Sequence, residues 1–136
     1  MISSVFQDMK VLERALDASV LRNQAASNNL ANVDTPNYKR QVVKFESFLA
    51  QALDTRKLKT YTTHKKHVST RQNNVNDVSI KISRDNAENH MRVDGNNVDI
   101  DAEMTLLSKN NIYYNALIGQ LSKKLDVIQN TITQVK

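Results

Sequence analysis

The chain has 136 residues, a length typical of one domain, with 40% hydrophobic residues and a formal net charge of +5. It contains only 2 Gly and 1 Pro, so long continuous elements with few tight turns are expected. The lack of Cys excludes disulfides and thiolate chemistry, and 3 Phe, 4 Tyr and no Trp argue against a large core. The 19 basic residues are interspersed with 14 acidic ones, which favours a solvated surface over a nucleic-acid or membrane-binding one.

Residues 1–35 predict a long helix. Steps of four and three residues separate the members of a heptad seam, the pattern of a coiled coil. A second face of small residues predicts another close neighbour for this helix. The seam consists of Val5, Met9, Leu12, Leu16, Ser19, Asn23, Ala26, Leu30 and Val33, and the second face of Val11, Ala15, Ala18 and Ala25.

A proline turn closes this helix. Pro36 lacks an N–H and disfavours helical geometry at Thr35, so the helix cannot continue past it. The segment Thr35-Pro36-Asn37-Tyr38 predicts a type II turn, because Pro suits its second position. Asn37 then takes the third position, where it is one of the few residues other than Gly that tolerate a positive φ.

Residues 99–136 predict a second long helix, with Asp99 as its N-cap. The four-three alternation runs here for five heptads, and Asn111 is its one clearly polar member. A helix of this length is typical of a coiled coil or an assembly, although an amphipathic helix of a compact bundle is the alternative. The seam positions are Ile100, Met104, Leu107, Asn111, Tyr114, Ile118, Leu121, Leu125, Ile128, Ile132 and Val135.

Between the two helices, residues 36–98 form a middle region of different periodicity. Phe45, Phe48, Leu49, Ala52 and Leu53 fit a short helix, whereas Val78, Ile80 and Ile82 alternate with polar residues as in a half-buried strand. A segment between Leu58 and Val68 could pair with that strand. The expected fold is therefore mainly α, with the terminal helices packed as an antiparallel coiled coil and a small extended or β middle region.

Candidate sites for chemistry are weak. His64 and His67 lack the further ligands that a metal site needs, and the Gly of the acidic stretch from Asp94 to Glu103 stands at the wrong position for a calcium loop. The acidic stretch instead predicts a turn leading into a capped helix. A basic cluster from Arg56 to Arg71 lacks any known nucleic-acid motif. We expect no enzyme activity, no metal, no cofactor and no nucleic-acid partner.

Two motifs together resemble the flagellar rod and hook family. Leu30-Ala31-Asn32 followed by Thr35-Pro36 and Tyr38 closes the first helix, and the segment from Asp94 to Asp101 opens the last one. The turn motif comprises Asn32, Thr35, Pro36, Asn37 and Tyr38. The family usually has Gly after Thr-Pro, where this chain has Asn37. The short length and Thr63-His64 resemble the proximal rod subunits most.

The resemblance implies a structural subunit of the proximal rod, exported by the flagellar type III apparatus and transmitting motor torque. It implies contacts with other copies, with the rod subunits FlgC, FlgF and FlgG, and with FliE, the MS ring and the export gate protein FlhB. Phe45 and Leu49 match the short Phe-x-x-x-apolar export segment of family members, and a small amphipathic helix contact is the alternative reading. The chain could also be FlgC itself.

The sequence has no Sec signal peptide and no apolar run of the ~20 residues that span a bilayer. These features alone would place the protein in the cytoplasm, whereas the resemblance places it in the basal body, across the periplasm, after export. The other class of function that the heptads allow is a soluble coiled-coil adaptor or chaperone of a secretion system. Such a protein would not need the turn at Thr35 and Pro36.

Overall fold

The computed structural model describes residues 2–53, 78, 80–85 and 93–134. Two long helices dominate it, α1 (Ile2–Ala31) and α3 (Ile100–Gln134). Between them in sequence lie the strand β1 (Gln41–Lys44), the short helix α2 (Glu46–Leu53) and the strand β2 (Lys81–Arg84). The expectation of a mainly α chain with a small β element in its middle region is confirmed. Within the described residues, no helix is long and apolar enough to span a membrane.

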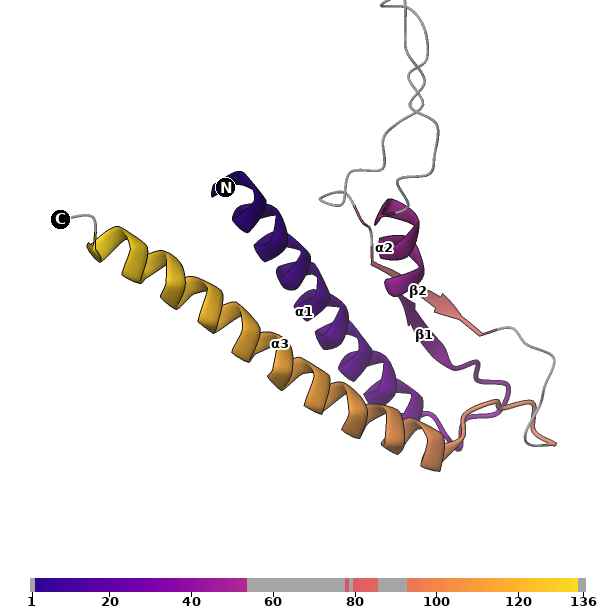
Figure 1. Ribbon diagram of the computed structural model, residues 1–136. Helices are drawn as coiled ribbons and strands as arrows, with labels where there is room; N and C mark the ends of the chain where they lie inside the picture. The colour runs from indigo at the N-terminus through magenta and orange to yellow at the C-terminus, as the bar shows by residue number, and fades with distance from the viewer. Residues whose placement is uncertain (1, 54–77, 79, 86–92, 135–136) are drawn as a thin grey trace, which may run out of the picture.

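Helices α1 and α3 form an antiparallel pair. The C-terminal end of α1 and the N-terminal end of α3 meet at one end of the molecule, and the opposite ends of both helices lie at the other (Figure 1). At 1.5 Å per residue, the 35 residues of α3 form a rod of about 52 Å. An ion pair of 2.9 Å between Lys124 Nζ and Asp8 Oδ2 joins the two helices near the chain termini.

Local sequence accounts for the helix ends. The Asp99 carboxylate accepts a hydrogen bond of 3.1 Å from the Ala102 N–H, which confirms Asp99 as the N-cap of α3. Helix α1 ends at Ala31, before the expected limit of residue 35. The N–H of Val33 bonds the Leu30 carbonyl three residues back, and the N–H of Thr35 likewise bonds the Asn32 carbonyl. These tighter turns end the helix before Pro36 is reached.

The two strands form one antiparallel sheet, in which Val42 pairs with Ser83 and Val43 with Ile82. The strand expected around Ile80 and Ile82 is thus confirmed at Lys81–Arg84. Its partner, however, is β1 at Gln41–Lys44, directly before α2, a strand that we did not predict. The segment between Leu58 and Val68, which we considered as a partner, lies outside the described residues, as do His64, His67, Val135 and the basic cluster from Arg56 to Arg71.

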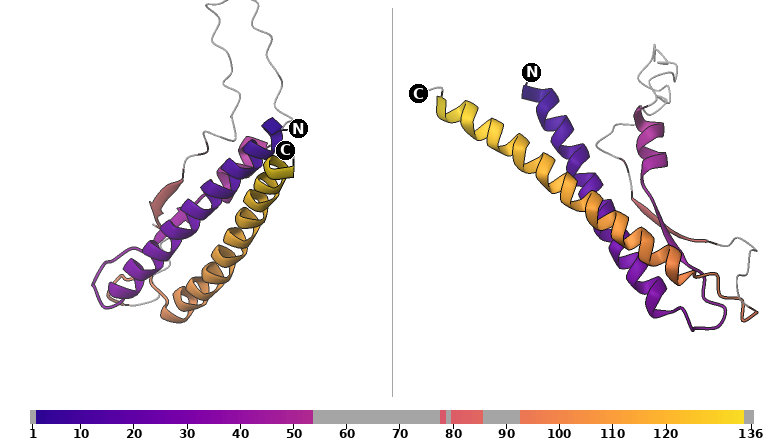
Figure 2. Two further views of the ribbon diagram at one scale, coloured as in Figure 1. Left: turned by 90° about the vertical axis from the view of Figure 1, so that its left-hand side faces the viewer. Right: turned by 60° about the horizontal axis from the view of Figure 1, so that its bottom comes forward.

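A small core lies between α1 and the rest of the chain. It joins Ala15 and Ala18 of α1 to Phe45, Val78 and Leu117. The sheet and α2 lie on the opposite side of α1 from much of α3, so α1 is the middle layer (Figures 1 and 2). The small residues of α1 were expected to admit a close neighbour, and the neighbour that they admit includes the bulky ring of Phe45, which is 2% exposed.

Candidate assembly interface

Asn96 joins the end of α1 to the start of α3. Its side-chain amide is fully buried and donates to three backbone carbonyls, those of Asn32 at 3.0 Å, Val33 at 2.8 Å and Thr35 at 3.0 Å. Its carbonyl oxygen accepts from the N–H of Val98 at 2.8 Å. The Asn32 and Thr35 carbonyls also accept from backbone N–H groups of the turn, and Asn96 adds a second donor that lies 64 and 61 residues further along the chain.

The proline turn docks against the same loop. The Tyr38 N–H donates to the Thr35 carbonyl at 3.3 Å, and Asn37 has a φ of 58°, which confirms the expected positive φ at the third turn position. The Asn37 N–H donates to the carbonyl of Asp94 at 3.0 Å. Gly95 has a φ of +79°, and a Cβ there would lie 2.6 Å from the Asn37 side-chain oxygen. The positive φ favours glycine at position 95, and a Cβ there would also displace the Asn37 side chain.

Two more asparagines fix β1 to the helices. The Asn29 side chain accepts from the Gln41 N–H at 2.8 Å and donates to the Gln41 carbonyl at 3.0 Å, as a neighbouring strand would. Asn97 accepts from the Arg40 N–H at 2.7 Å. Arg40 then forms an ion pair of 3.0 Å with Glu103, whose side chain is 4% exposed. The acidic stretch is thus a turn leading into a capped helix, as expected, and holds its polar groups in internal bonds.

A polar cluster lies inside the α1–α3 contact. Buried Asn110 of α3 donates to the Ser19 carbonyl at 2.7 Å and to the Asn23 side-chain oxygen at 2.8 Å. The Ser19 hydroxyl donates back to the Asn110 side-chain oxygen at 3.0 Å. Asn23 also donates to Asn111 at 3.3 Å. Since a helix shifted by one turn would separate these partners, the cluster fixes the register of the pair, as a buried Asn does in coiled coils.

The structure divides the expected seam of α3 into two sets. Leu107, Tyr114, Leu121 and Ile128 are half-buried, whereas Met104, Ile118, Leu125 and Ile132 are exposed, Leu125 by 48% and Ile132 by 69%. The most buried side chains of α3 are instead Glu103, Asn110 and Leu117, which are spaced seven residues apart. The face of α3 that meets the rest of the chain therefore keeps the half-buried row of the expected seam, but its second row is that of Asn110 instead of the exposed row of Leu125.

The expected seam of α1 is more buried than that of α3. The side chains of Ser19 and Ala26 are buried, and the side chain of Val5 lies outside the described set. The half-buried members of this seam are Met9, Leu12, Leu16, Asn23, Leu30 and Val33. Three members of the neighbouring small-residue face, Ala15, Ala18 and Ala25, are buried as well.

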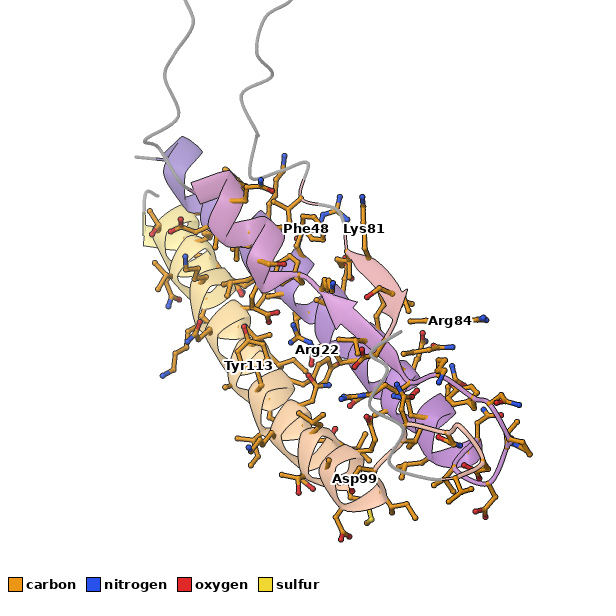
Figure 3. The ribbon with its side chains drawn as sticks, turned by 90° about the vertical axis from the view of Figure 1, so that its right-hand side faces the viewer. Arg22, Phe48, Lys81, Arg84, Asp99 and Tyr113 are labelled. Carbon is orange, nitrogen blue, oxygen red and sulfur yellow. The ribbon has the colours of Figure 1, made fainter. Side chains whose placement is uncertain are left out.

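A groove of about 610 Å³ runs between α3 and β1, with α1 at its base. Ala25 and Ala26 form the base, Val42 lies on one wall, and Leu106 and Tyr113 lie on the other. Figure 3 views the molecule from this side, with Tyr113 on α3 and Arg22 over the space between the helices. Arg22 forms an ion pair with Glu46 across the upper part of the groove.

The candidate export residues lie in the core. Phe45 is 2% exposed within the cluster formed with Ala15 and Ala18, and half-buried Leu49 packs against that cluster. Phe45 also directly precedes α2, and its carbonyl accepts from the Leu49 N–H of the first helical turn at 2.9 Å. In the folded chain, Phe45 therefore offers almost no surface to another protein, and Leu49 offers only part of its side chain.

Comparison with known proteins decides the family. The family model described as "Flagella basal body rod protein" matches residues 9–39, from α1 through the proline turn. The flagellar basal body rod protein FlgB of Bacillus subtilis is 36% identical over 122 residues, covering 90% of each chain. The chain belongs to the FlgB family of flagellar basal body rod proteins. FlgB of Borreliella burgdorferi is 38% identical over 76% of this chain, and FlgB of Escherichia coli is 26% identical over 96% of it.

Family membership makes this a structural protein of the flagellar basal body rod, as the motifs at its two ends indicated. The match to residues 9–39 covers the segment that Asn96 ties to α3. Between the two proximal rod subunits that the motifs left open, these relatives favour FlgB over FlgC. The relatives are rod proteins, which is consistent with the expectation that the chain is not an enzyme.

Proposed function

We propose that the chain is a structural subunit of the proximal rod, which assembles through its terminal helices and transmits motor torque. The observation that carries this proposal is the apolar surface of α3, where Met104, Ile118, Leu125 and Ile132 are exposed at helical spacing. A stripe of this kind on a family member whose relatives form a rod is suited to contact further helices. The paired helices, held in register by the Asn110 cluster, supply a stiff element that can carry torque.

Residues 1–35 and 99–136 act in this proposal as the axial helices, and residues 36–98 as the middle region. The seam residues of α3 serve two purposes. Leu107, Tyr114, Leu121 and Ile128 stabilise the pair within one chain, while the exposed set contacts neighbouring subunits. The turn motif from Asn32 to Tyr38 holds the two helices at the angle that the assembly requires.

The chain reaches the rod through the flagellar type III apparatus, with Phe45 and Leu49 as the export segment. Because Phe45 is 2% exposed in the folded chain, the export gate protein FlhB can bind this segment only before the core forms. Folding and export recognition are therefore mutually exclusive. The mature location is the rod, within the cell envelope, where FlgC, FlgF, FlgG, FliE and the MS ring are the proposed partners.

The terminal helices become fully ordered only on assembly. The distal halves are the parts of α1 and α3 farthest from the Asn96 junction. Their exposed apolar positions leave them with little internal burial to offset the entropy of ordering. Hydrogen exchange on the dilute monomer should show rapid exchange in both distal halves and slower exchange near the Asn96 junction. Full protection of both helices in the monomer would contradict this proposal.

Purified hook–basal bodies test the main proposal. A tagged chain expressed in place of the native subunit should copurify with them and be absent from those of a strain with blocked flagellar export. Recovery only in the cytosol would refute the rod role and favour a coiled-coil adaptor or chaperone of a secretion system.

A further inference from the structure

The groove and the exposed stripe of α3 lie on different sides of the same helix. We define the stripe as Met104, Ile118, Leu125 and Ile132, and the groove as the space bounded by Ala25, Ala26, Val42, Leu106 and Tyr113. Positions 106 and 113 fall about 100° to 140° around α3 from positions 118 and 125, at 100° per residue. The stripe of one chain therefore cannot fill the groove of the same chain.

We propose that the groove receives the stripe of a second copy of this chain, a head-to-tail contact that rests on the rod function proposed above. Leu106 and Tyr113 are 45% and 42% exposed and are spaced by seven residues, as are Ile118, Leu125 and Ile132. Equal heptad spacing lets the apolar side chains of one helix insert between those of the other. The Ala25 and Ala26 side chains at the base are small enough to admit a helix closely.

Charges at the two surfaces are complementary. Lys109 lines the groove, one helical turn from Leu106 and from Tyr113. Asp126 directly follows Leu125 in α3 and flanks the stripe, about 100° around the helix from Leu125. Among the residues that the structure describes, neither Lys109 nor Asp126 forms an ion pair. The other charged residues that line the groove already form ion pairs with each other, Arg22 with Glu46 and Arg40 with Glu103.

This complementarity sets the register of the contact. Seating Leu125 between Leu106 and Tyr113 brings Asp126 beside Lys109 of the receiving copy. The two copies are then displaced by about 16 residues, or about 24 Å along parallel helices. Because the two surfaces differ, each copy offers one groove and one stripe, and the contact propagates instead of closing into a dimer.

Engineered cysteines test the contact, since the chain has no native Cys. A chain carrying both Tyr113→Cys and Leu125→Cys, incorporated into basal bodies and then oxidised, should give a ladder of dimers, trimers and larger species. The matched control pairs Leu125→Cys with Ile112→Cys, because Ile112 is the adjacent residue, is 72% exposed and does not line the groove. The control should remain monomeric.

Three results would overturn the proposal: no ladder from incorporated Tyr113→Cys/Leu125→Cys chains, an equal ladder from the control, or dimers from Leu125→Cys alone, which would indicate a symmetric contact. Absence of the unaltered chain from basal bodies would instead refute the rod function itself.

A charge exchange tests the same contact if the cysteine substitutions block incorporation. Lys109→Glu and Asp126→Lys should each reduce incorporation by about 2- to 5-fold, and the double variant should restore it. A double variant as poor as the single ones would also overturn the proposal.

Discussion

Removing the Asn96 side chain should destabilise the chain more than any exposed substitution. In Asn96→Ala, the carbonyls of Asn32, Val33 and Thr35 lose their shared donor, and the buried Val98 N–H loses its acceptor. The amide has two N–H groups, so up to three hydrogen bonds are lost at a side chain that is 0% exposed. At about 1 kcal/mol for each, and more for a buried group left unpaired, the free energy of unfolding should fall by about 2–4 kcal/mol.

Asn96→Asp separates this mechanism from a loss of packing. Aspartate has nearly the same shape and keeps the oxygen that accepts from Val98, yet it would place a carboxylate against the three carbonyls. We therefore expect Asn96→Asp to be at least as destabilising as Asn96→Ala. Urea unfolding followed by circular dichroism measures both, with exposed Asn115→Ala as the matched control. A loss below about 1 kcal/mol for both variants would refute the view that Asn96 links the helix ends.

Three further predictions concern the turn, the stripe and the polar cluster. Gly95→Ala should cost about 1–2 kcal/mol from its positive φ and more from the Asn37 contact, so Gly95→Ala combined with Asn37→Gly should recover part of the loss in urea unfolding; no recovery would show that the contact is unimportant. Leu125→Asp should leave the folded chain intact but block incorporation into the rod, whereas Leu121→Asp should weaken both, and normal motility of either strain would contradict the packing scheme. Ser19→Ala should cost about 1–2 kcal/mol by leaving Asn110 partly unpaired, measured by thermal unfolding, and an unchanged midpoint would rule out the register role of the cluster.

Local signals in the sequence predicted the elements that depend on neighbouring residues. The cap at Asp99, the positive φ of Asn37 and the short helix after Phe45 each follow from the chemistry of a few adjacent residues, and the structure confirms them. The alternation at Ile80 and Ile82 likewise predicted β2. We missed β1, because Val42 and Val43 are adjacent instead of alternating and their strand is specified by its partners.

The structural role of the asparagines was the part of the candidate interface that was hardest to predict from the sequence. Asn29, Asn96 and Asn97 are all buried, although asparagine is mostly a surface residue. Each one bonds backbone groups that are distant in sequence, for example Asn96 with Asn32. The run Asn96-Asn97 before the helix cap was the one signal in the sequence that these asparagines are structural. The sequence does not show which distant backbone groups they bond.

The sequence by itself determined that two long helices flank a small middle region, where the proline turn lies, and to which family the chain belongs. Only the tertiary structure decided which face of α3 meets α1. Heptad spacing specifies which residues share a helix face, but α3 has apolar residues on more than one face. The hydrogen bonds of Ser19 and Asn23 to Asn110 select among these faces, because unpaired buried amides would cost more than exposed leucines. Leu125 and Ile132 thus stay outside, available to a neighbouring chain.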